Sequence, residues 1–238
     1  MAMTPPQRRR LYLMRHGSVD YFTPEGKPIP PDGVCLNARG RAQADAAGAV
    51  FAQAGVRFDR VVVSGLPRTV ETAQRVLAAA GQELEPQIEP ALQEIRSGRL
   101  ADIAPHDLER AFLGAFGGGF TAPEEVEAMR FMGGESVGEL LDRVLPAFEH
   151  WRNSGEWDCM LMVLHGGVNR AILSSALAGR RAFFGGFEQA PACINVLDVG
   201  TRGTIVRATN LAAPTWLQHD VRHTTMEELL SQYVRQPA

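Results

Sequence analysis

Two histidines occupy equivalent places in the sequence, each just after a short apolar segment and directly before a glycine. His16 follows residues 11–14, and His165 follows residues 159–164. Short apolar runs of this kind are typical of strands that are buried on both faces of a parallel sheet. Side chains that follow such strands meet at the carboxyl edge of the sheet, where open α/β folds bind their ligands. Two imidazoles at one edge can serve as a nucleophile, an acid or a base.

Two arginines and a glutamate follow the same pattern. Arg15 directly precedes His16, Arg68 lies just after an apolar segment at 61–63, and Glu94 follows a further short candidate strand. The guanidinium fork binds planar oxyanions through two N–H groups, which a lysine ammonium cannot do. Taken singly, each of these residues is more simply a surface charge or a structural histidine. Together they predict an anion-binding site that is able to transfer protons.

The elements that would position these residues alternate between strands and helices. Asn37, the pair Ser136 and Glu139, and Gly179 are expected cap residues of the helices. The alternation indicates the α/β class, as a three-layer α/β/α sandwich around a mostly parallel sheet. We expect strands at 11–14, 61–63, 159–164, 192–198 and 204–209, with a short one around Ile88, and helices at about 38–54, 67–81, 105–113, 122–131, 136–153 and 166–178.

The chain reads as one domain, 1–238, because no linker divides it. Residues 96–135 differ from the rest in their glycines and phenylalanines, and we interpret them as a helical and loop insertion that covers the pocket. Residues 214–238 give no prediction of secondary structure. The apolar residues of the insertion form either a wall for the ligand or the insertion's own core: Phe112, Phe116, Phe120, Phe131 and Met132.

The composition narrows the class of protein. The chain carries 24 basic and 27 acidic residues without a Lys/Arg-rich block, which disfavours a nucleic-acid binder. Lys27 is the only lysine, which nearly excludes Schiff-base and P-loop lysine chemistry. For most of the arginines, codon usage is the simpler explanation. Three widely spaced cysteines favour a reducing compartment over a disulfide framework or a zinc site. Since neither a signal peptide nor a bilayer-spanning apolar run is evident, we expect a soluble, cytoplasmic protein.

Six segments of the chain resemble, in the same order, the motifs of the histidine phosphatase superfamily, in its phosphoglycerate mutase-like branch. The R-H-G signature is common by chance, whereas the ordered set of six is specific. The match runs from about residue 11 to 209 and comprises Leu13–Gly17 (R-H-G), 36–44 (L-x-x-x-G-x-x-Q-A), 64–73 (S-x-L-x-R-x-x-E-T-A), 92–94 (L-x-E), 133–136 (G-G-E-S) and 163–170 (V-x-H-G-G-x-x-R).

This resemblance implies a role for each residue of the candidate site. His16 resembles the nucleophile that forms a phosphohistidine, and His165 resembles the second histidine, which donates to the phosphoryl group. Glu94 resembles the general acid that protonates the leaving alcohol and then the base that activates water. Arg15 and Arg68 resemble the clamp on the phosphoryl oxygens. No metal or other cofactor is required by this scheme.

The residues expected to bind substrate are Arg15, Arg68, Gly166, Ser18 and Arg96. Many family members have an asparagine as a further phosphate ligand where this chain has Phe22, and whether Ser18 or Thr23 replaces it is open. Arg96 and Arg99 either meet a second anionic group of the substrate or are plain surface charges.

Two departures from the family pattern favour a phosphatase-type member over a mutase. The mutases carry H-G-N where this chain has Gly167 as the third residue, and E-R-x-Y-G where residues 94–98 read E-I-R-S-G. The leading hypothesis is a metal-independent phosphatase that hydrolyses a small phosphate monoester through a phosphohistidine. The alternatives are a bisphosphoglycerate-dependent phosphoglycerate mutase and a non-catalytic phosphate-binding module. We expect a small phosphorylated metabolite as partner, and neither nucleic acid nor membrane. A homodimer stays open, because dimers are common in the family.

Overall fold

A six-stranded sheet forms the centre of the computed structural model, which describes residues 8–23, 27–116, 122–201, 203–213, 215 and 221–234. The strands are β1 (Arg9–Arg15), β2 (Arg60–Val63), β3 (Gln87–Ile88), β4 (Cys159–Leu164), β5 (Ile194–Gly200) and β6 (Gly203–Leu211). Their order is β3-β2-β4-β1-β5-β6. Neighbours from β3 to β1 are parallel, and β5 is antiparallel to both β1 and β6. Among these strands β5 alone runs against the others, which confirms the mostly parallel sheet.

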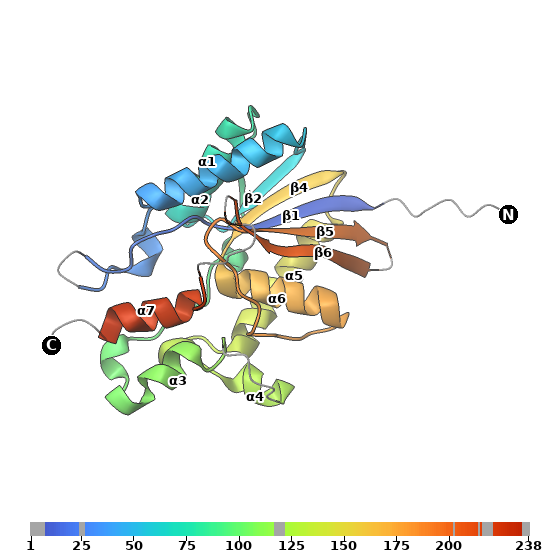
Figure 1. Ribbon diagram of the computed structural model, residues 1–238. Coiled ribbons are helices and arrows are strands. Elements are labelled where there is room, and N and C mark those ends of the chain that lie inside the picture. Colours follow the sequence, from blue (N-terminus) through green and yellow to red (C-terminus); the bar gives the residue numbers. More distant parts are fainter. Residues whose placement is uncertain are drawn as a thin grey trace.

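Helices cover both faces of the sheet, as Figure 1 shows. The four long ones are α1 (Ala38–Gln53) and α2 (Pro67–Ala79) on one face, and α5 (Val137–Asn153) and α6 (Gly166–Ala178) on the other. Alternate side chains of a strand point to opposite faces, so Met160, Met162 and Leu164 of β4 pack towards α5 and α6. Leu161 and Val163 pack towards α1 and α2. Burial on both faces explains the continuous apolar run, and the expected α/β/α sandwich is confirmed.

The long helices begin and end at the expected cap residues. The side chain of Asn37 accepts a hydrogen bond from the N–H of Gly40 (2.8 Å) at the start of α1. Ser136 and Glu139 form a capping box at the start of α5. α6 ends where Gly179 adopts a left-handed φ of 66°.

β5 begins later than the expected strand 192–198. Ala192 has a left-handed φ of 58°, and its N–H donates to the carbonyl oxygen of His16 (3.0 Å). Ala192 therefore belongs to the loop that supports the first histidine. Antiparallel pairing with β1 starts only at Ile194.

Short helices make up the insertion at 96–135, and a further helix, α7 (Thr225–Val234), lies where no element was expected. In Figure 1, α3 and α4 lie below α6, on the side away from the sheet, and α7 lies to the left of α6. α3 packs against α7, and the rings of Phe112 and Tyr233 are 5.9 Å apart. No helix within the described ranges is long and apolar enough to cross a membrane. The short helices of 96–135 are α3 (Leu108–Leu113), α4 (Pro123–Ala128) and 3₁₀ turns at Leu100–Asp102, Pro105–Asp107 and Phe131–Gly133. Two more 3₁₀ turns, Pro31–Gly33 and Pro90–Leu92, lie outside this segment.

Two glycines pack against each other beside the first histidine. A Cβ atom on Gly17 would lie 2.5 Å from the carbonyl oxygen of Gly40, and a Cβ atom on Gly40 would collide with the carbonyl oxygen of Ser18. α1 can approach the loop after β1 this closely only because both residues lack side chains. The contact gives a physical reason for a glycine after His16 and for another in the first turn of α1.

Gly40→Ala is expected to destabilise the fold, because the added methyl group meets backbone that cannot move without displacing the loop after β1. Overpacking of this kind costs about 1–3 kcal/mol, and urea unfolding would measure it. Gly33→Ala is the matched control, since an added Cβ there meets no atom within 4 Å. Equal stability of Gly40→Ala and the wild type would contradict the assigned role of this contact.

Candidate functional site

The two histidines lie side by side where β1 and β4 end. Their ring centroids are 5.3 Å apart at an interplanar angle of 64°, and both side chains are buried. The N–H of His16 donates to the carbonyl of Leu164 (3.0 Å), which attaches the loop after β1 to the end of β4. Parallel pairing of these two strands therefore places His165 next to His16.

His16 is held as a neutral imidazole whose Nε2 atom has no hydrogen bond to any residue that the structure describes. Its Nδ1 atom lies 2.7 Å from the carbonyl oxygen of Gly17. Because a carbonyl oxygen can only accept, Nδ1 carries the proton. Burial lowers the pKa of His16 well below its ordinary value, and the charges of Arg68 and Arg15 add to the effect. An unprotonated Nε2 lone pair is the form in which histidine acts as a nucleophile.

Arg15 and Arg68 each use one nitrogen as an anchor and leave another unpaired. Arg15 Nη1 donates to the carbonyl of Gln189 (2.5 Å) and to Thr225 Oγ1 (3.1 Å). Arg68 Nη1 donates to the carbonyl of Pro31 (2.6 Å). Both Nε atoms are buried and have no hydrogen-bond partner among the described residues. Buried N–H groups are rarely left unpaired, so the arrangement fits an oxyanion bound by the two guanidinium groups.

A third arginine, Arg170, lies near this pair, and the sequence analysis did not assign it. It is 5% exposed, and it donates to the carbonyl of Gly185 (3.2 Å) and to Glu188 (3.1 Å). A Cβ atom on Gly166 would lie 3.2 Å from Arg170 Nη1 and 3.6 Å from Arg15 Nε. Glycine at 166 thus keeps open the space between two guanidinium groups. The available signal was the last residue of H-G-G-x-x-R, which lies four positions after Gly166 on the same helix face.

Glu94 lies at the N-terminus of α6. The N–H of Gly167 donates to both of its carboxylate oxygens (3.2 and 3.1 Å), and the N–H of Ile95 donates to Oε1 (2.9 Å). A Cβ atom on Gly167 would lie 2.6 Å from Oε1. A side chain at 167 would therefore require the Glu94 carboxylate to move. Negative charge is also favourable at a helix N-terminus.

Arg143, on α5, fixes the loop that carries Glu94. Its guanidinium donates to three carbonyl oxygens of residues 91–94 at 2.6–3.0 Å and forms two hydrogen bonds of 2.7 Å with Glu135. Glu135, from the G-G-E-S segment, also accepts from the N–H of Arg96 (2.9 Å). The sequence analysis missed Arg143, because nothing local distinguishes it from a surface arginine.

Two cavities meet at Arg15. One, of about 720 Å³, is lined among others by Arg15, Arg68, Glu94, Arg96, Gly166 and Arg170, and the other, of about 800 Å³, by Arg15, His16 and Ser18. Ser18 lines the same cavity as His16, and its binding role stays a prediction. Thr23 accepts a hydrogen bond from Lys27 N–H within its own loop (3.2 Å).

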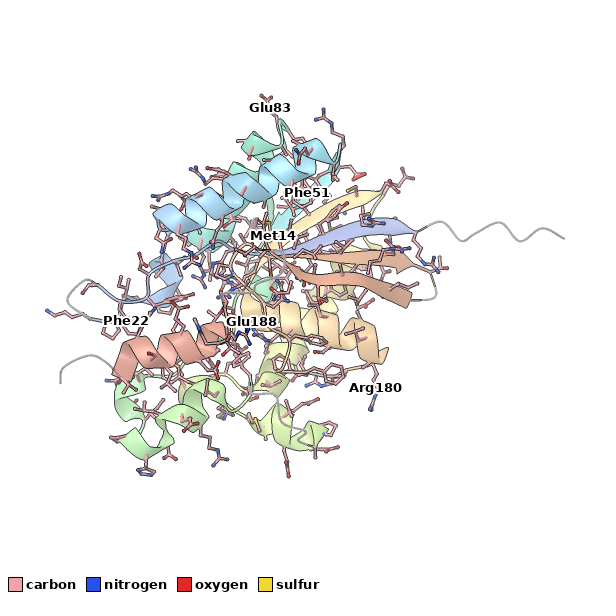
Figure 2. The ribbon with its side chains drawn as sticks, in the orientation of Figure 1. Met14, Phe22, Phe51, Glu83, Arg180 and Glu188 are labelled. Carbon is pink, nitrogen blue, oxygen red and sulfur yellow. The ribbon has the colours of Figure 1, made fainter. Side chains whose placement is uncertain are left out.

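Apolar side chains line the outer part of the 720 Å³ cavity. Phe116, Phe131 and Met132 of the insertion contribute to this wall, whereas Phe112 is fully buried and belongs to a core. Phe120 lies outside the described residues. Phe22, at the position of the family's asparagine, is a further part of the wall. Figure 2 shows Phe22 and Glu188 near opposite ends of α7.

Glu135→Gln is expected to lower stability in a pH-dependent way. Burial raises the pKa of Glu135, but hydrogen bonds from Arg143 and from the N–H of Arg96 outweigh it, so the pKa is lowered below the ordinary 4.5. The carboxylate therefore contributes stability above pH 4.5, and this contribution is lost as the pH falls through the lowered value.

In urea unfolding at pH 7 the variant should lose about 2 kcal/mol of its free energy of unfolding, and this free energy should depend less on pH below 4.5. Its kcat should also be lower, because the loop that carries Glu94 is released. Glu83→Gln is the control, since Glu83 lies on the surface at the far side of the molecule (Figure 2). An acid limb unchanged in Glu135→Gln would contradict the assignment.

Comparison with known proteins agrees with this geometry. A family model described as histidine phosphatase superfamily (branch 1) matches residues 11–212. The chain is 30% identical over 167 residues to a 2,3-bisphosphoglycerate-dependent phosphoglycerate mutase of Mesorhizobium japonicum, a match that covers 67% of this chain and 73% of that protein.

Solved structures are similar over most of the chain. A protein of Escherichia coli described as an α-ribazole-5'-P phosphatase has a TM-score of 0.66 at 25% identity, with 85% of this chain and 96% of that chain covered. A mycobacterial glucosyl-3-phosphoglycerate phosphatase has a TM-score of 0.62 at 23% identity, with 85% and 98% covered, and supports the fold. The family match spans every motif that carries a residue of the site, and the chain therefore belongs to the histidine phosphatase superfamily, branch 1.

Proposed function

We propose that the protein is a metal-independent phosphatase that hydrolyses a small phosphate monoester through a phosphohistidine at His16. One observation carries the proposal: the free Nε2 atom of His16 belongs to a site in which the Nε atoms of Arg15 and Arg68 are buried and unpaired among the described residues. A nucleophilic lone pair beside unpaired cationic donors is suited to a phosphoryl group, whose oxygens carry the charge of the transition state.

The first half-reaction transfers the phosphoryl group to the protein. Nε2 of His16 attacks phosphorus, a P–N bond forms, and the ester P–O bond breaks. Arg15 and Arg68 balance the charge on the phosphoryl oxygens. Glu94, held at the start of α6 by Gly167, gives its proton to the leaving alkoxide oxygen and becomes a carboxylate.

The second half-reaction releases phosphate. The Glu94 carboxylate takes a proton from a water molecule, whose oxygen attacks the phosphohistidine. The P–N bond breaks, the electron pair returns to Nε2 of His16, and Glu94 is again protonated for the next cycle. The same carboxyl group thus acts as acid and then as base.

The outer part of the cavity supports a phosphatase with a partly apolar substrate. The wall formed by Phe22, Phe116 and Phe131 would contact the alcohol part of the ester, which leaves after the first step. Contact between Gly167 and Glu94 gives a physical basis for the phosphatase-type sequence at this point. The similarity to a phosphoglycerate mutase makes mutase activity the second candidate.

His16→Ala should reduce hydrolysis of p-nitrophenyl phosphate in the presence of EDTA to the background rate, because the variant has no nucleophile. The wild type should also carry an acid-labile, base-stable phosphoryl group after a rapid acid-free quench with detergent. His150→Ala is the matched control, since His150 is an exposed histidine of α5 outside the site. Undiminished turnover by His16→Ala would sink the mechanism.

A coupled assay with 3-phosphoglycerate and 2,3-bisphosphoglycerate distinguishes the alternatives. We expect release of inorganic phosphate from a panel of phosphate monoesters without interconversion of phosphoglycerates. Efficient interconversion would establish the mutase instead. Thermal stabilisation by phosphate without turnover of any ester in the panel would establish a non-catalytic binding module.

Arg96→Ala tests whether the rim of the cavity binds a second anionic group. Its exposed side chain lines the 720 Å³ cavity, so the variant should raise KM for hydrolysis of a phosphorylated carboxylic acid about fivefold, equivalent to an exposed ion pair of about 1 kcal/mol. KM for p-nitrophenyl phosphate should not change. Arg180→Ala, at the far end of α6 (Figure 2), is the control. Equal increases for both substrates would refute a second anion subsite.

A further inference from the structure

A chain of buried hydroxyl groups leads away from the second histidine. His165 Nε2 lies 2.7 Å from Ser64 Oγ, and Ser64 Oγ lies 3.0 Å from Thr69 Oγ1. Thr69 Oγ1 lies 2.8 Å from the carbonyl oxygen of Leu66. His165, Ser64 and Thr69 are all completely buried. The chain begins at the site, passes from β2 to the start of α2, and ends at a backbone carbonyl.

The carbonyl at the end of this chain fixes the direction of every hydrogen bond in it. A carbonyl oxygen can only accept, so Thr69 gives its one hydroxyl proton to Leu66. Thr69 then has only lone pairs for Ser64, so Ser64 gives its one proton to Thr69. Ser64 has no proton left for His165, and therefore accepts one from Nε2. The N–H of Leu66 occupies the other lone pair of Ser64 (3.3 Å).

The proton on Nε2 determines what Nδ1 of His165 can do. A neutral imidazole has one N–H, so Nδ1 holds a lone pair, and it is buried without a hydrogen-bond partner in the described parts of the chain. Burial lowers the pKa of His165 well below its ordinary value, and Arg68, His16, Arg15 and Arg143 lower it further. The neutral ring would present a lone pair, not a donor, to an entering phosphoryl oxygen.

We propose that Ser64 and Thr69 are positioning residues that couple anion binding at the phosphoryl site to the uptake of one proton. Nδ1 of His165 receives this proton from solvent and donates it in a hydrogen bond to an oxygen of the bound dianion. The proposal rests on the proposed phosphoryl site but not on turnover. The only bond that forms is the N–H bond at Nδ1, with a proton from solvent. The resulting imidazolium donates through Nε2 to Ser64 and through Nδ1 to the anion.

The charges around His165 explain why the proton arrives with the anion. Arg15 and His16 face the ring from the end of β1, Arg68 from α2 and Arg143 from α5, and they disfavour a further positive charge. Glu94, which accepts the N–H of Gly167, is an acidic group at this end of α6. A bound dianion adds two negative charges beside these cations and so favours the imidazolium.

Calorimetry with sulfate measures the proposed proton directly. Sulfate stays a dianion across the working range, so it brings no proton of its own. Titration of the full-length protein at pH 7 in buffers of different ionisation enthalpy gives the number of protons taken up, which should be about one. Histidine ¹⁵N NMR should show His165 as the Nε2–H form before sulfate is added and as the imidazolium afterwards, while His16 keeps its Nδ1–H form.

Thr69→Val is the decisive variant. Without the Thr69 acceptor, Ser64 can turn its proton towards Nε2, so that the neutral ring carries N–H at Nδ1 and donates to sulfate as it is. Uptake should fall by half or more while sulfate still binds. Ser64→Ala, which leaves Nε2 without an acceptor, should have the same effect. The buried control Ser174→Ala should keep the wild-type proton uptake, because among the described residues the Ser174 hydroxyl bonds to the N–H of Phe184 (2.7 Å) and not to the hydroxyl chain. A purely structural role would not change the proton count.

Other results of the calorimetry and NMR would overturn either the proton linkage alone or the phosphoryl site as well. Sulfate binding without proton uptake by the wild type, or an Nδ1–H form of His165 in the absence of sulfate, overturns the proton linkage and leaves the proposed phosphatase intact. Uptake that appears on His16 in the NMR spectrum also overturns it. Failure of sulfate to bind at all overturns both the linkage and the phosphoryl site on which the proposed function depends.

Discussion

Repulsion among buried cations is the constraint that organises this site. Arg15, Arg68 and Arg170 are 9%, 2% and 5% exposed, and like charges interact strongly where solvent is excluded. Carbonyl oxygens and one carboxylate hold the guanidinium groups in place. Both histidines stay neutral because burial, Arg68 and Arg15 lower their pKa values. The neutral form of His16 is thus a direct result of its burial and of the charges of Arg68 and Arg15.

Two buried hydrogen-bond networks hold Arg15 and the loop of Glu94 in place. On one side the carbonyl of Gln189 anchors Arg15, and the side chain of Gln189 is bonded to Asn169 and Asn195, all three fully buried. On the other side Arg143 holds the loop that carries Glu94. Buried polar networks favour one arrangement of a core, so Arg15 and the loop that carries Glu94 are held in fixed positions relative to each other.

Those parts of the fold and site that depend on local signals could be predicted from the sequence. Asn37, Ser136 and Gly179 act on backbone groups within a few residues, and the apolar runs of β1 and β4 place the two histidines without further information. The ordered motifs added Arg68 and Glu94.

What could not be predicted depends on contacts between distant segments. Ala192 leaves β5 because its N–H bonds to the carbonyl oxygen of His16, far away in the sequence. Arg143 bonds to three backbone carbonyl oxygens and to Glu135. Because every residue has a carbonyl oxygen, residue types do not indicate such partners. α7 was missed because its docking depends on aromatic rings from two other segments.

The ring of Tyr233 has a consequence for how substrate range can change. It lies 6.3 Å from Phe22 and 5.9 Å from Phe112, so one aromatic side chain of α7 joins the loop after β1 to the insertion. α7 itself lies beyond residue 212, where the family match ends, yet Thr225 at its start contacts Arg15 and Glu188. The three rings therefore lie in segments outside the six motifs that carry the site residues. Phe22 lines the 720 Å³ cavity, and substitution of Tyr233 or Phe112 would reshape that cavity indirectly, by moving the segments that the three rings hold together.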